Sequence, residues 1–337
     1  MLYTNLGKSK LKVSKLCIGC MSFGVAGSMH EWTLSERDTQ NMVEHALSLG
    51  INFFDTANCY SKGSSEEYLG KALKKAFDNH LTSRDKVVIA SKVYFNEGRL
   101  SATAIKREID GTLKRLGTDY LDLYIIHRFD YETPIEETMQ ALDSLVKEGK
   151  VRALGASAMY GYQFMNMQQV AKDNNFARFE AMENHYNLLY REDERELIPI
   201  CKQQQVSLMP YSPLAAGHLS RNTWNSESIR SKTDKAAAYK YNSTEDEDLK
   251  VVHRVYEIAQ KYNVKMSEIA LAWMWKKGIA SPIIGATKAN YLDEAVNALN
   301  VQLTDEDVAY LEELYQPHKV VGAIDKNPPL GTLVITK

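Results

Sequence analysis

Hydrophobic and polar positions follow two alternating periods along this chain. Short apolar runs are followed by segments whose apolar residues recur every three or four positions, and this sequence of patterns repeats eight times. The runs are nearly continuous, which is typical of strands buried on both faces of a parallel sheet. The expected strands are residues 14–24, 51–57, 86–94, 120–130, 151–158, 179–189, 206–214 and 280–288.

The segments between these runs carry helix start and stop signals. Ser35 is an expected N-cap, Gly50 and Gly117 are expected stops, and Pro134 begins a helix, where its missing N–H costs nothing. Residues 215–245 show no clear period and predict an irregular stretch, longer than ordinary connections. The expected helices are residues 35–50, 64–77, 101–117, 134–149, 160–174, 191–205, 246–264, 265–278 and 289–300.

Eight strand–helix pairs predict an α/β fold, a closed (β/α)8 TIM barrel. Alternating units imply parallel strands with right-handed crossovers, and one barrel domain accommodates residues 1–337. We expect an N-terminal β-hairpin before the first strand, a long loop after strand seven and a loop-like tail over residues 317–337. The alternative is an open doubly wound sheet. That fold usually carries G-x-G-x-x-G after its first strand, and we find neither this motif nor a Walker A sequence.

Composition narrows the classes of partner. The chain is 44% hydrophobic and 25% charged, with a formal net charge of −2, so there is no bulk basic field for nucleic acid. We find no signal peptide and no apolar run that would span a bilayer, so no membrane is expected. Four cysteines are too few for a disulfide scaffold, which predicts a cytoplasmic protein. Cys17 and Cys20 form C-x-x-C, but in a strand context that favours packing over redox chemistry or zinc binding.

Polar residues stand where several apolar runs end. Asp55, Lys92 and His127 close the second, third and fourth runs, and Tyr60 follows Asp55 by five residues. Each has an ordinary structural explanation by itself: a turn cap, a solvated end, a hydrogen-bonding histidine and a packed loop residue. In a barrel, however, the C-terminal strand ends form one ring around one mouth. We therefore expect these four side chains to converge.

The four residue types together suggest acid catalysis. Asp55 would pair with Lys92, and a positive charge beside a phenol lowers its pKa, so that Tyr60, hydrogen-bonded by His127, becomes a useful proton donor. Such a donor suits reduction of a carbonyl, whose oxygen takes a proton while its carbon takes a hydride. Because side chains deliver no hydride, a nicotinamide cofactor is implied. Tyr211 could stack on its ring, and the start of the last helix suits a phosphate.

These residues lie in segments that resemble the aldo-keto reductases. The matching segments run from "LGKSKLKVSKLCIGCMSFG" through "NFFDTANCYSKGSSEEYLGKAL", "IASKV", "LDLYIIHRFD", "LGASA", "ENHYNLLYREDERELIPIC", "MPYSPLAAGHL" and "PIIGATK", to about residue 317. Within that superfamily the chain looks like the bacterial single-chain oxidoreductases, the YajO-like group. The resemblance implies a barrel that binds NADP(H), with Tyr60 as the acid and Asp55, Lys92 and His127 as its catalytic partners.

The resemblance also assigns cofactor contacts. Ser157 and Asn184 would hold the carboxamide, and the segment from Ser212 to Arg221 would form a clasp over the pyrophosphate. The chain departs from the family pattern at four places: Ala158 stands where Asn is common, Glu183 where Gln is common, Thr287 and Tyr291 where an Arg is frequent, and Ala295 in place of an Asn. The resemblance also implies that the adenosine 2′-phosphate and adenine lie at Gly285, Thr287, Lys288, Tyr291 and Glu294. The implied cofactor contacts are Met21, Asp55, Ser157, Glu183, Asn184, Tyr211, Ser212, Pro213, Leu214, Gly217, Leu219, Arg221, Ile284, Gly285, Thr287, Lys288, Tyr291 and Glu294.

Substrate contacts are expected in the loops above the mouth. The candidates form an aromatic-walled pocket for a small carbonyl substrate, and the irregular stretch is expected to move over bound cofactor. The candidates are Trp32, Tyr94, Phe95, Arg128, Phe129 and Tyr131.

Two other functions remain as alternatives. One is a nucleotide-binding regulatory module, like the channel-associated β-subunits of the same superfamily. Such a module would not need a tyrosine whose pKa is shifted for proton donation. The other is a metal-dependent barrel hydrolase, but only Asp55 and His127 stand clearly at strand ends as possible ligands. No metal is therefore expected, and the oligomeric state stays open.

Overall fold

The chain folds around eight parallel strands. The computed structural model describes residues 1–320, in which the strands lie in the order β10-β3-β4-β5-β6-β7-β8-β9 and every neighbouring pair is parallel. The strands are β3 (Cys17–Gly19), β4 (Phe53–Asp55), β5 (Val88–Val93), β6 (Leu121–Ile126), β7 (Val151–Ser157), β8 (Phe179–Glu183), β9 (Ser207–Leu208) and β10 (Ile283–Ile284).

Backbone hydrogen bonds connect the two end strands of this order. The amide of Ala280 donates to the carbonyl of Leu208 at 3.0 Å, and the amide of Ile283 donates to the carbonyl of Pro210 at 2.9 Å. These bonds bring β9 beside β10, so the sheet curls into the (β/α)8 arrangement that the sequence predicts. Regular strand pairing between β9 and β10 is limited, because the expected strands 206–214 and 280–288 each form only two residues of regular strand.

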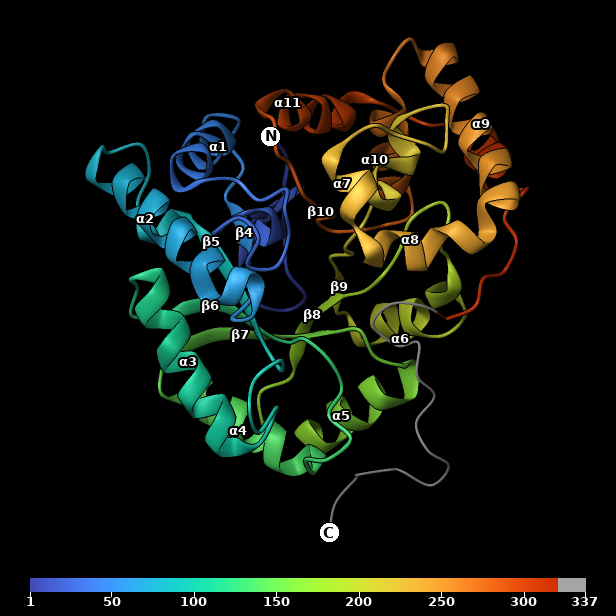
Figure 1. The fold of residues 1–337 in the computed structure, drawn as a ribbon. Helices are drawn as coiled ribbons and strands as arrows, with labels where there is room; N and C mark the ends of the chain where they lie inside the picture. The colour runs from blue at the N-terminus through green and yellow to red at the C-terminus, as the bar shows by residue number, and fades with distance from the viewer. Residues whose placement is uncertain (321–337) are drawn as a thin grey trace.

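Helices surround the strands, and Figure 1 shows α1 to α6 running round the outside of the sheet. The predicted caps are present: the Ser35 side chain accepts from the Asp38 amide, Gly117 ends α3 in the left-handed conformation, and Pro134 precedes α4. The long helices are α1 (Glu36–Ser48), α2 (Ser64–Asp78), α3 (Ala102–Leu116), α4 (Ile135–Lys147), α5 (Gly161–Asp173), α6 (Leu197–Gln204), α9 (Glu245–Tyr262), α10 (Met266–Lys276), α11 (Ala289–Asn297) and α12 (Asp305–Glu312).

Three sequence expectations need correction. Residues 215–245 are not structureless: they contain a 3₁₀ segment (Ala215–Ser220) and the short helices α7 (Ile229–Thr233) and α8 (Lys235–Tyr241). The helix expected over 191–205 divides into a 3₁₀ turn (Glu192–Arg195) and α6, because Glu196 between them has a φ of −142°. Helix α12 was not expected. Most of the tail expected over 317–337 lies outside the described residues.

The barrel has an inner and an outer core. Alternate strand residues point to opposite faces, so Phe53 packs inside the barrel with Ala90 and Ile125, whereas Phe54 packs outward in the larger core that also contains helix residues. The predicted N-terminal hairpin, β1 (Tyr3–Asn5) and β2 (Lys12–Ser14), adds Leu6, Leu11 and Val13 to the inner core. Hydrophobic side chains therefore form the core inside the barrel.

Candidate active site

The alternation of strand side chains places the polar residues inside the barrel. Asp55 lies two residues after Phe53, Lys92 two after Ala90, and Glu183 two after Ala181, and these three apolar residues all belong to the inner core. Each polar residue stands near the C-terminal end of its strand, so all three face the same interior space. His127 also points inward, because it lies two residues after Ile125, which belongs to the inner core.

Lys92 is the centre of the resulting cluster. Its ammonium is fully buried and donates to Asp55 Oδ2, to the Thr56 carbonyl at 3.0 Å and to the Tyr60 hydroxyl at 3.3 Å. It also lies 3.4 Å from Glu183 Oε2. Burial lowers the pKa of Lys92, but Asp55 and Glu183 outweigh that effect and hold the pKa well above its usual range. Lys92 is therefore a fixed positive charge next to the phenol.

A tight turn places Tyr60 next to the Lys92 ammonium. Tyr60 begins a 3₁₀ turn (Tyr60–Gly63) directly after β4, and its amide donates to the Ala57 carbonyl at 3.1 Å. Ser61 and Lys62 follow with positive φ angles of 47° and 55°, a conformation that is uncommon outside glycine. The turn folds the Tyr60 side chain back over the strand ends, where its ring lies 4.9 Å from the Lys92 ammonium.

The expected lowering of the Tyr60 pKa does not occur in this structure. Burial raises the pKa of Tyr60 well above its usual value, and the opposing effect of Lys92 is smaller. The sequence argument considered the charge but could not include the loss of water around the hydroxyl. Tyr60 consequently holds its proton at neutral pH; burial makes it a weaker acid than a free tyrosine, and Lys92 reduces that effect.

His127 lies beside Tyr60, with their rings edge to face at 5.7 Å between centroids. Its Nδ1 is 3.9 Å from the Cys59 sulfur, and this contact replaces the expected hydrogen bond to the Tyr60 hydroxyl. Burial, Lys92 and Arg128 lower the pKa of His127 well below its usual value. The imidazole is therefore neutral and can position a polar group without adding a charge.

The residues assigned to the carboxamide lie on adjoining strands. Ser157 ends β7 and donates its hydroxyl to the Glu183 carbonyl at 2.8 Å, and Asn184 Nδ2 donates to Asp193 Oδ2 at 2.9 Å. Burial raises the pKa of Asp193 to about 7. Within residues 1–320, Asn184 Oδ1 is buried without a hydrogen-bond partner. The site thus offers an unused buried acceptor to a ligand amide.

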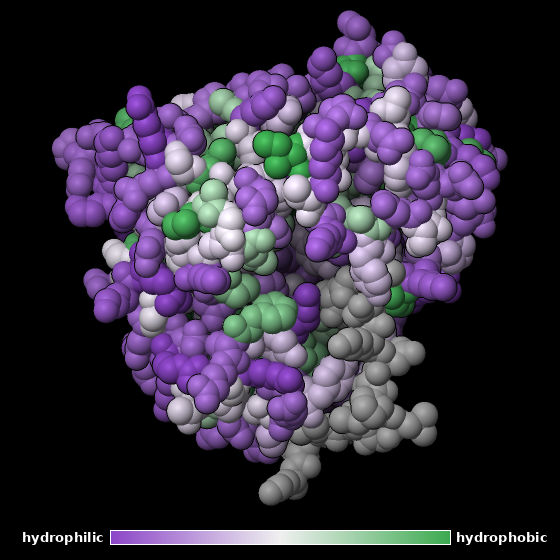
Figure 2. All heavy atoms as spheres, in the orientation of Figure 1, coloured by the Kyte–Doolittle hydropathy of each residue, from purple (hydrophilic) through white to green (hydrophobic). Residues whose placement is uncertain are grey.

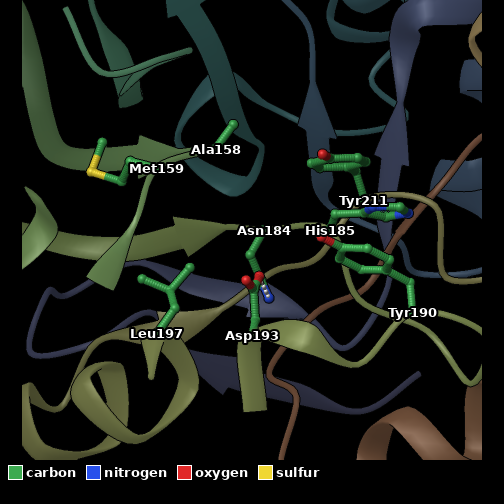
Figure 3. Close-up of a pocket in the computed structure, with 8 residues that line it drawn as sticks. All are labelled: Ala158, Met159, Asn184, His185, Tyr190, Asp193, Leu197 and Tyr211. Carbon is green, nitrogen blue, oxygen red and sulfur yellow. Dashed lines mark hydrogen bonds between the residues drawn. The ribbon is translucent and has the colours of Figure 1, made fainter. Parts of the chain in front are cut away.

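Tyr211 forms one end of an aromatic stack. Figure 3 shows Tyr211, His185 and Tyr190 lying one over another, with Asn184 and Asp193 pointing toward each other nearby. The Tyr211 and His185 rings are 5.2 Å apart and nearly parallel, and the Lys240 ammonium from α8 lies 4.7 Å from the Tyr211 ring centroid. The cavity lined by these residues measures about 10 Å³, the space of about one water. Helix α8 therefore lies close to the stacking residue.

The proposed clasp has a backbone suited to an anion. Ser212, Ala215, Ala216 and Gly217 have positive φ angles of 56°, 47°, 54° and 99°. Successive amides in such mixed conformations form concave nests that bind anions. Arg221 donates to the Gly217 carbonyl at 2.9 Å, and its Nε is buried without a partner in the described chain. These features fit a diphosphate group.

The remaining candidates divide between the clasp and the adenosine end. Arg221 and Trp224 line a cavity of about 150 Å³ that extends to α7 and α8, and Pro213, Leu214 and Leu219 belong to the same segment. Met21 lies in the turn after β3, and Ile284 ends β10. The adenosine candidates Gly285, Thr287, Lys288, Tyr291 and Glu294 lie at the start of α11, where Lys288 precedes its first residue and all but Glu294 are exposed.

Of the substrate candidates, Phe95 and Arg128 lie next to the cluster, whereas Phe129 is buried in the outer core. Phe95 is half exposed and its ring lies 5.0 Å from that of His127, and the Arg128 guanidinium lies 5.2 Å from the Phe95 ring. Tyr94 contacts Phe95 edge to face, Phe129 and Tyr131 form a similar pair, and Trp32 lies under Arg230 of α7 at 4.5 Å. Figure 2 shows this view of the surface as mostly hydrophilic with a small central hollow.

The described residues contain neither a candidate metal site nor a candidate membrane span. No three His, Cys, Asp or Glu side chains of residues 1–320 are grouped as ligands for a metal ion. None of the helices in the described part has the length and apolarity to cross a bilayer. Cys17 and Cys20 are buried and free, and burial raises the pKa of both thiols.

Comparisons with known proteins agree with this site. The family model described as "Aldo/keto reductase family" matches residues 15–316. The versiconal hemiacetal acetate reductase of Aspergillus parasiticus is 40% identical over 95% of this chain and 98% of its own length. An aldo-keto reductase of Fusarium vanettenii is 40% identical over 95% of this chain and 92% of its own, and one of Alternaria alternata is 38% identical over 95% and 93%.

These relatives correct one expectation and confirm another. They are fungal, so the expected placement in the bacterial YajO-like group is not supported. The wider resemblance is confirmed, because the family model covers most of the chain and the relatives match almost all of it. Enzymes of this family are oxidoreductases that generally use a nicotinamide cofactor, usually NADP(H). The chain belongs to the aldo/keto reductase family.

Proposed function

We propose that this protein reduces aldehydes and ketones to alcohols with NADPH, with Tyr60 as the general acid. The observation that carries the proposal is the contact between Lys92 and the Tyr60 hydroxyl, 3.3 Å apart in the barrel interior, where Asp55 pairs with the ammonium. When bound, the cofactor would supply the hydride. Tyr60 would give its proton to the carbonyl oxygen, and the Lys92 charge would stabilise the phenolate that remains.

The residues of the site support NADP(H) as the cofactor. Asn184 Oδ1 offers an acceptor to the carboxamide, Tyr211 offers a ring face, and the backbone from Ser212 to Gly217 offers amides to the pyrophosphate. Lys288, exposed next to Tyr291, is our candidate for binding the adenosine 2′-phosphate of NADP(H). The four free cysteines support a cytoplasmic protein.

The aromatic mouth supports aromatic or bulky carbonyl substrates. Phe95 and Tyr94 present rings near His127, and a relative is named for reduction of versiconal hemiacetal acetate. The direct test mixes the purified protein with NADPH and a panel of aliphatic and aromatic aldehydes and ketones, and follows loss of NADPH absorbance. NADPH binding without turnover of any carbonyl would contradict the proposal and would favour a nucleotide-binding regulatory module.

Ala158 allows a prediction about cofactor affinity. Its φ is 50°, a conformation that Asn adopts more readily than Ala, and it stands beside Ser157. We expect Ala158→Asn to relieve roughly 1 kcal/mol of backbone strain. The new amide should also tighten NADPH binding about two- to tenfold, the worth of one hydrogen bond. Thermal unfolding and fluorescence titration measure the two effects.

The matched control for this substitution is Ala158→Gly. Glycine relieves the same strain but brings no amide, so we expect higher stability and unchanged NADPH affinity. If Ala158→Gly tightens NADPH binding as much as Ala158→Asn does, the carboxamide contact is wrong.

The clasp predicts protection from proteolysis. Residues 224–235 connect the 3₁₀ segment to α8, and most of them are exposed or partly exposed. We expect NADPH to slow cleavage there, because the bound form opens less often. Arg221→Met should need more NADPH for the same protection. The clasp would be refuted if saturating NADPH left the cleavage rate between Trp224 and Lys235 unchanged.

A further inference from the structure

Two buried carboxyl groups share one ammonium in the inner barrel. Lys92 is 0% exposed, Asp55 is 2% exposed and Glu183 is 4% exposed. Lys92 donates a hydrogen bond to Asp55, whereas Glu183 Oε2 lies 3.4 Å away and has no hydrogen-bond partner in residues 1–320. One positive charge therefore faces two groups that are both negative when ionised.

The geometry decides which carboxyl carries the negative charge. Asp55 makes the close contact to Lys92, and together they form a neutral ion pair. An ionised Glu183 would then be an uncompensated charge in a buried site, which is unfavourable. Burial, followed by Asp55, raises the pKa of Glu183 to about 8, against the opposing effect of Lys92.

Other titratable groups also face Glu183. Tyr60 lies on the turn after β4, Arg128 follows β6, and Cys17 begins β3. Arg128 is positive, but its effect on the pKa of Glu183 is smaller than the effects of Asp55 and Lys92. At neutral pH the surroundings therefore favour the protonated carboxyl.

A bound nicotinamide would need a hydrogen-bond donor here. The carboxamide oxygen is an acceptor, but the Ser157 hydroxyl donates to the Glu183 carbonyl and Asn184 Nδ2 donates to Asp193. Ala158 has no polar side chain. A protonated carboxyl has one O–H donor, whereas a carboxylate has none. Asn184 Nδ2 keeps a second N–H, and a protonated Glu183 would be a further donor beside it, one that a carboxylate could not provide.

We propose that Glu183 keeps a proton in the working protein and donates it to the carboxamide oxygen of the nicotinamide. The neutral acid would then do what an amide side chain does at this position, and its ionisation would release the cofactor. This inference rests on the proposed NADP(H) function. It makes cofactor affinity, and not only turnover, depend on pH.

The test compares NADPH affinity at several pH values in wild type and Glu183→Gln. A carboxyl with a pKa of about 8 is about one-tenth protonated at pH 9, so the apparent Kd of the wild type should rise about tenfold between pH 7 and 9. Glutamine donates at every pH, and the Kd of Glu183→Gln should change little. Quenching of protein fluorescence measures both without any turnover.

The control separates this proton from others. Burial lowers the pKa of Lys240 to about 8, and burial raises that of Asp193. Both residues are unchanged in Glu183→Gln, so the difference between wild type and this variant reports on Glu183 alone. Glu183→Leu has no donor and should bind NADPH weakly at every pH. An equal rise of Kd in wild type and Glu183→Gln overturns the proposal. Failure of all three proteins to bind NADPH at pH 7 would instead overturn the proposed function.

The pH dependence of thermal stability, measured without cofactor, tests whether Glu183 is protonated. The folded pKa of Glu183 lies above its unfolded value of about 4.5, so its contribution to stability is complete below pH 4.5 and is lost as pH rises through 8. The melting temperature of wild type should therefore fall relative to Glu183→Gln between pH 5 and 8. A constant difference over that range would show that Glu183 is already ionised at pH 5, which also contradicts the proposal.

Discussion

Tyr60→Phe is expected to lower the turnover of a good aldehyde substrate by about 10²- to 10⁴-fold, the usual contribution of a positioned acid. The variant loses the hydroxyl that lies 3.3 Å from Lys92 and keeps the ring that packs against His127. NADPH affinity should change little, because we assign none of the cofactor contacts to the Tyr60 hydroxyl. Single-turnover kinetics and fluorescence titration measure the two quantities separately.

The control for this experiment is Tyr124→Phe. Tyr124 is also buried, lies in β6, and has a hydroxyl without a hydrogen-bond partner in the described residues. It belongs to the outer core, away from the barrel interior, so its variant should keep wild-type turnover. Normal turnover by Tyr60→Phe would remove Tyr60 as the acid, and an equal loss in both variants would point to a general effect of removing a buried hydroxyl.

The periodicity of the sequence predicted the arrangement of the cluster well. Strand runs and helix signals specify a barrel, and the barrel brings Asp55, Lys92 and His127 to one end without any information on side-chain contacts. The position of Tyr60 follows from the short turn after β4. These predictions succeeded because they depend on topology and on the alternation of strand side chains, both of which are visible in the sequence.

The ionisation states were not predictable in the same way. The sequence suggested that Lys92 lowers the pKa of Tyr60, but burial raises it more. It also showed only that Glu183 stands where Gln is common and did not establish its ionisation, whereas burial and Asp55 favour its protonated form. Both outcomes depend on how much water surrounds a group, which the order of residues does not reveal. The short helices α7 and α8 were missed because they are too brief to establish a period.

Lys92→Met is expected to destabilise the protein by about 3–5 kcal/mol, the usual effect of removing one partner of a buried ion pair. Asp55 would lose the ammonium that compensates its charge in the barrel interior and would have to take up a proton or remain an isolated charge, and the Thr56 carbonyl would lose its donor. Turnover should also fall severely, because the phenolate formed at Tyr60 would lose its stabilising charge. Chemical denaturation measures the first effect, and kinetics at a temperature where the variant is folded measure the second.

The double variant Lys92→Met/Asp55→Asn separates these two losses. With both charges gone, no uncompensated ion remains beside the protonated Glu183, so most of the lost stability should return. Turnover should stay low, because neither Met nor Asn can replace the ammonium next to Tyr60. If the double variant is as unstable as Lys92→Met, the cost arises from packing rather than from the charge of Asp55. If it regains turnover, Lys92 does not support the acid, and the mechanism proposed for this site is wrong.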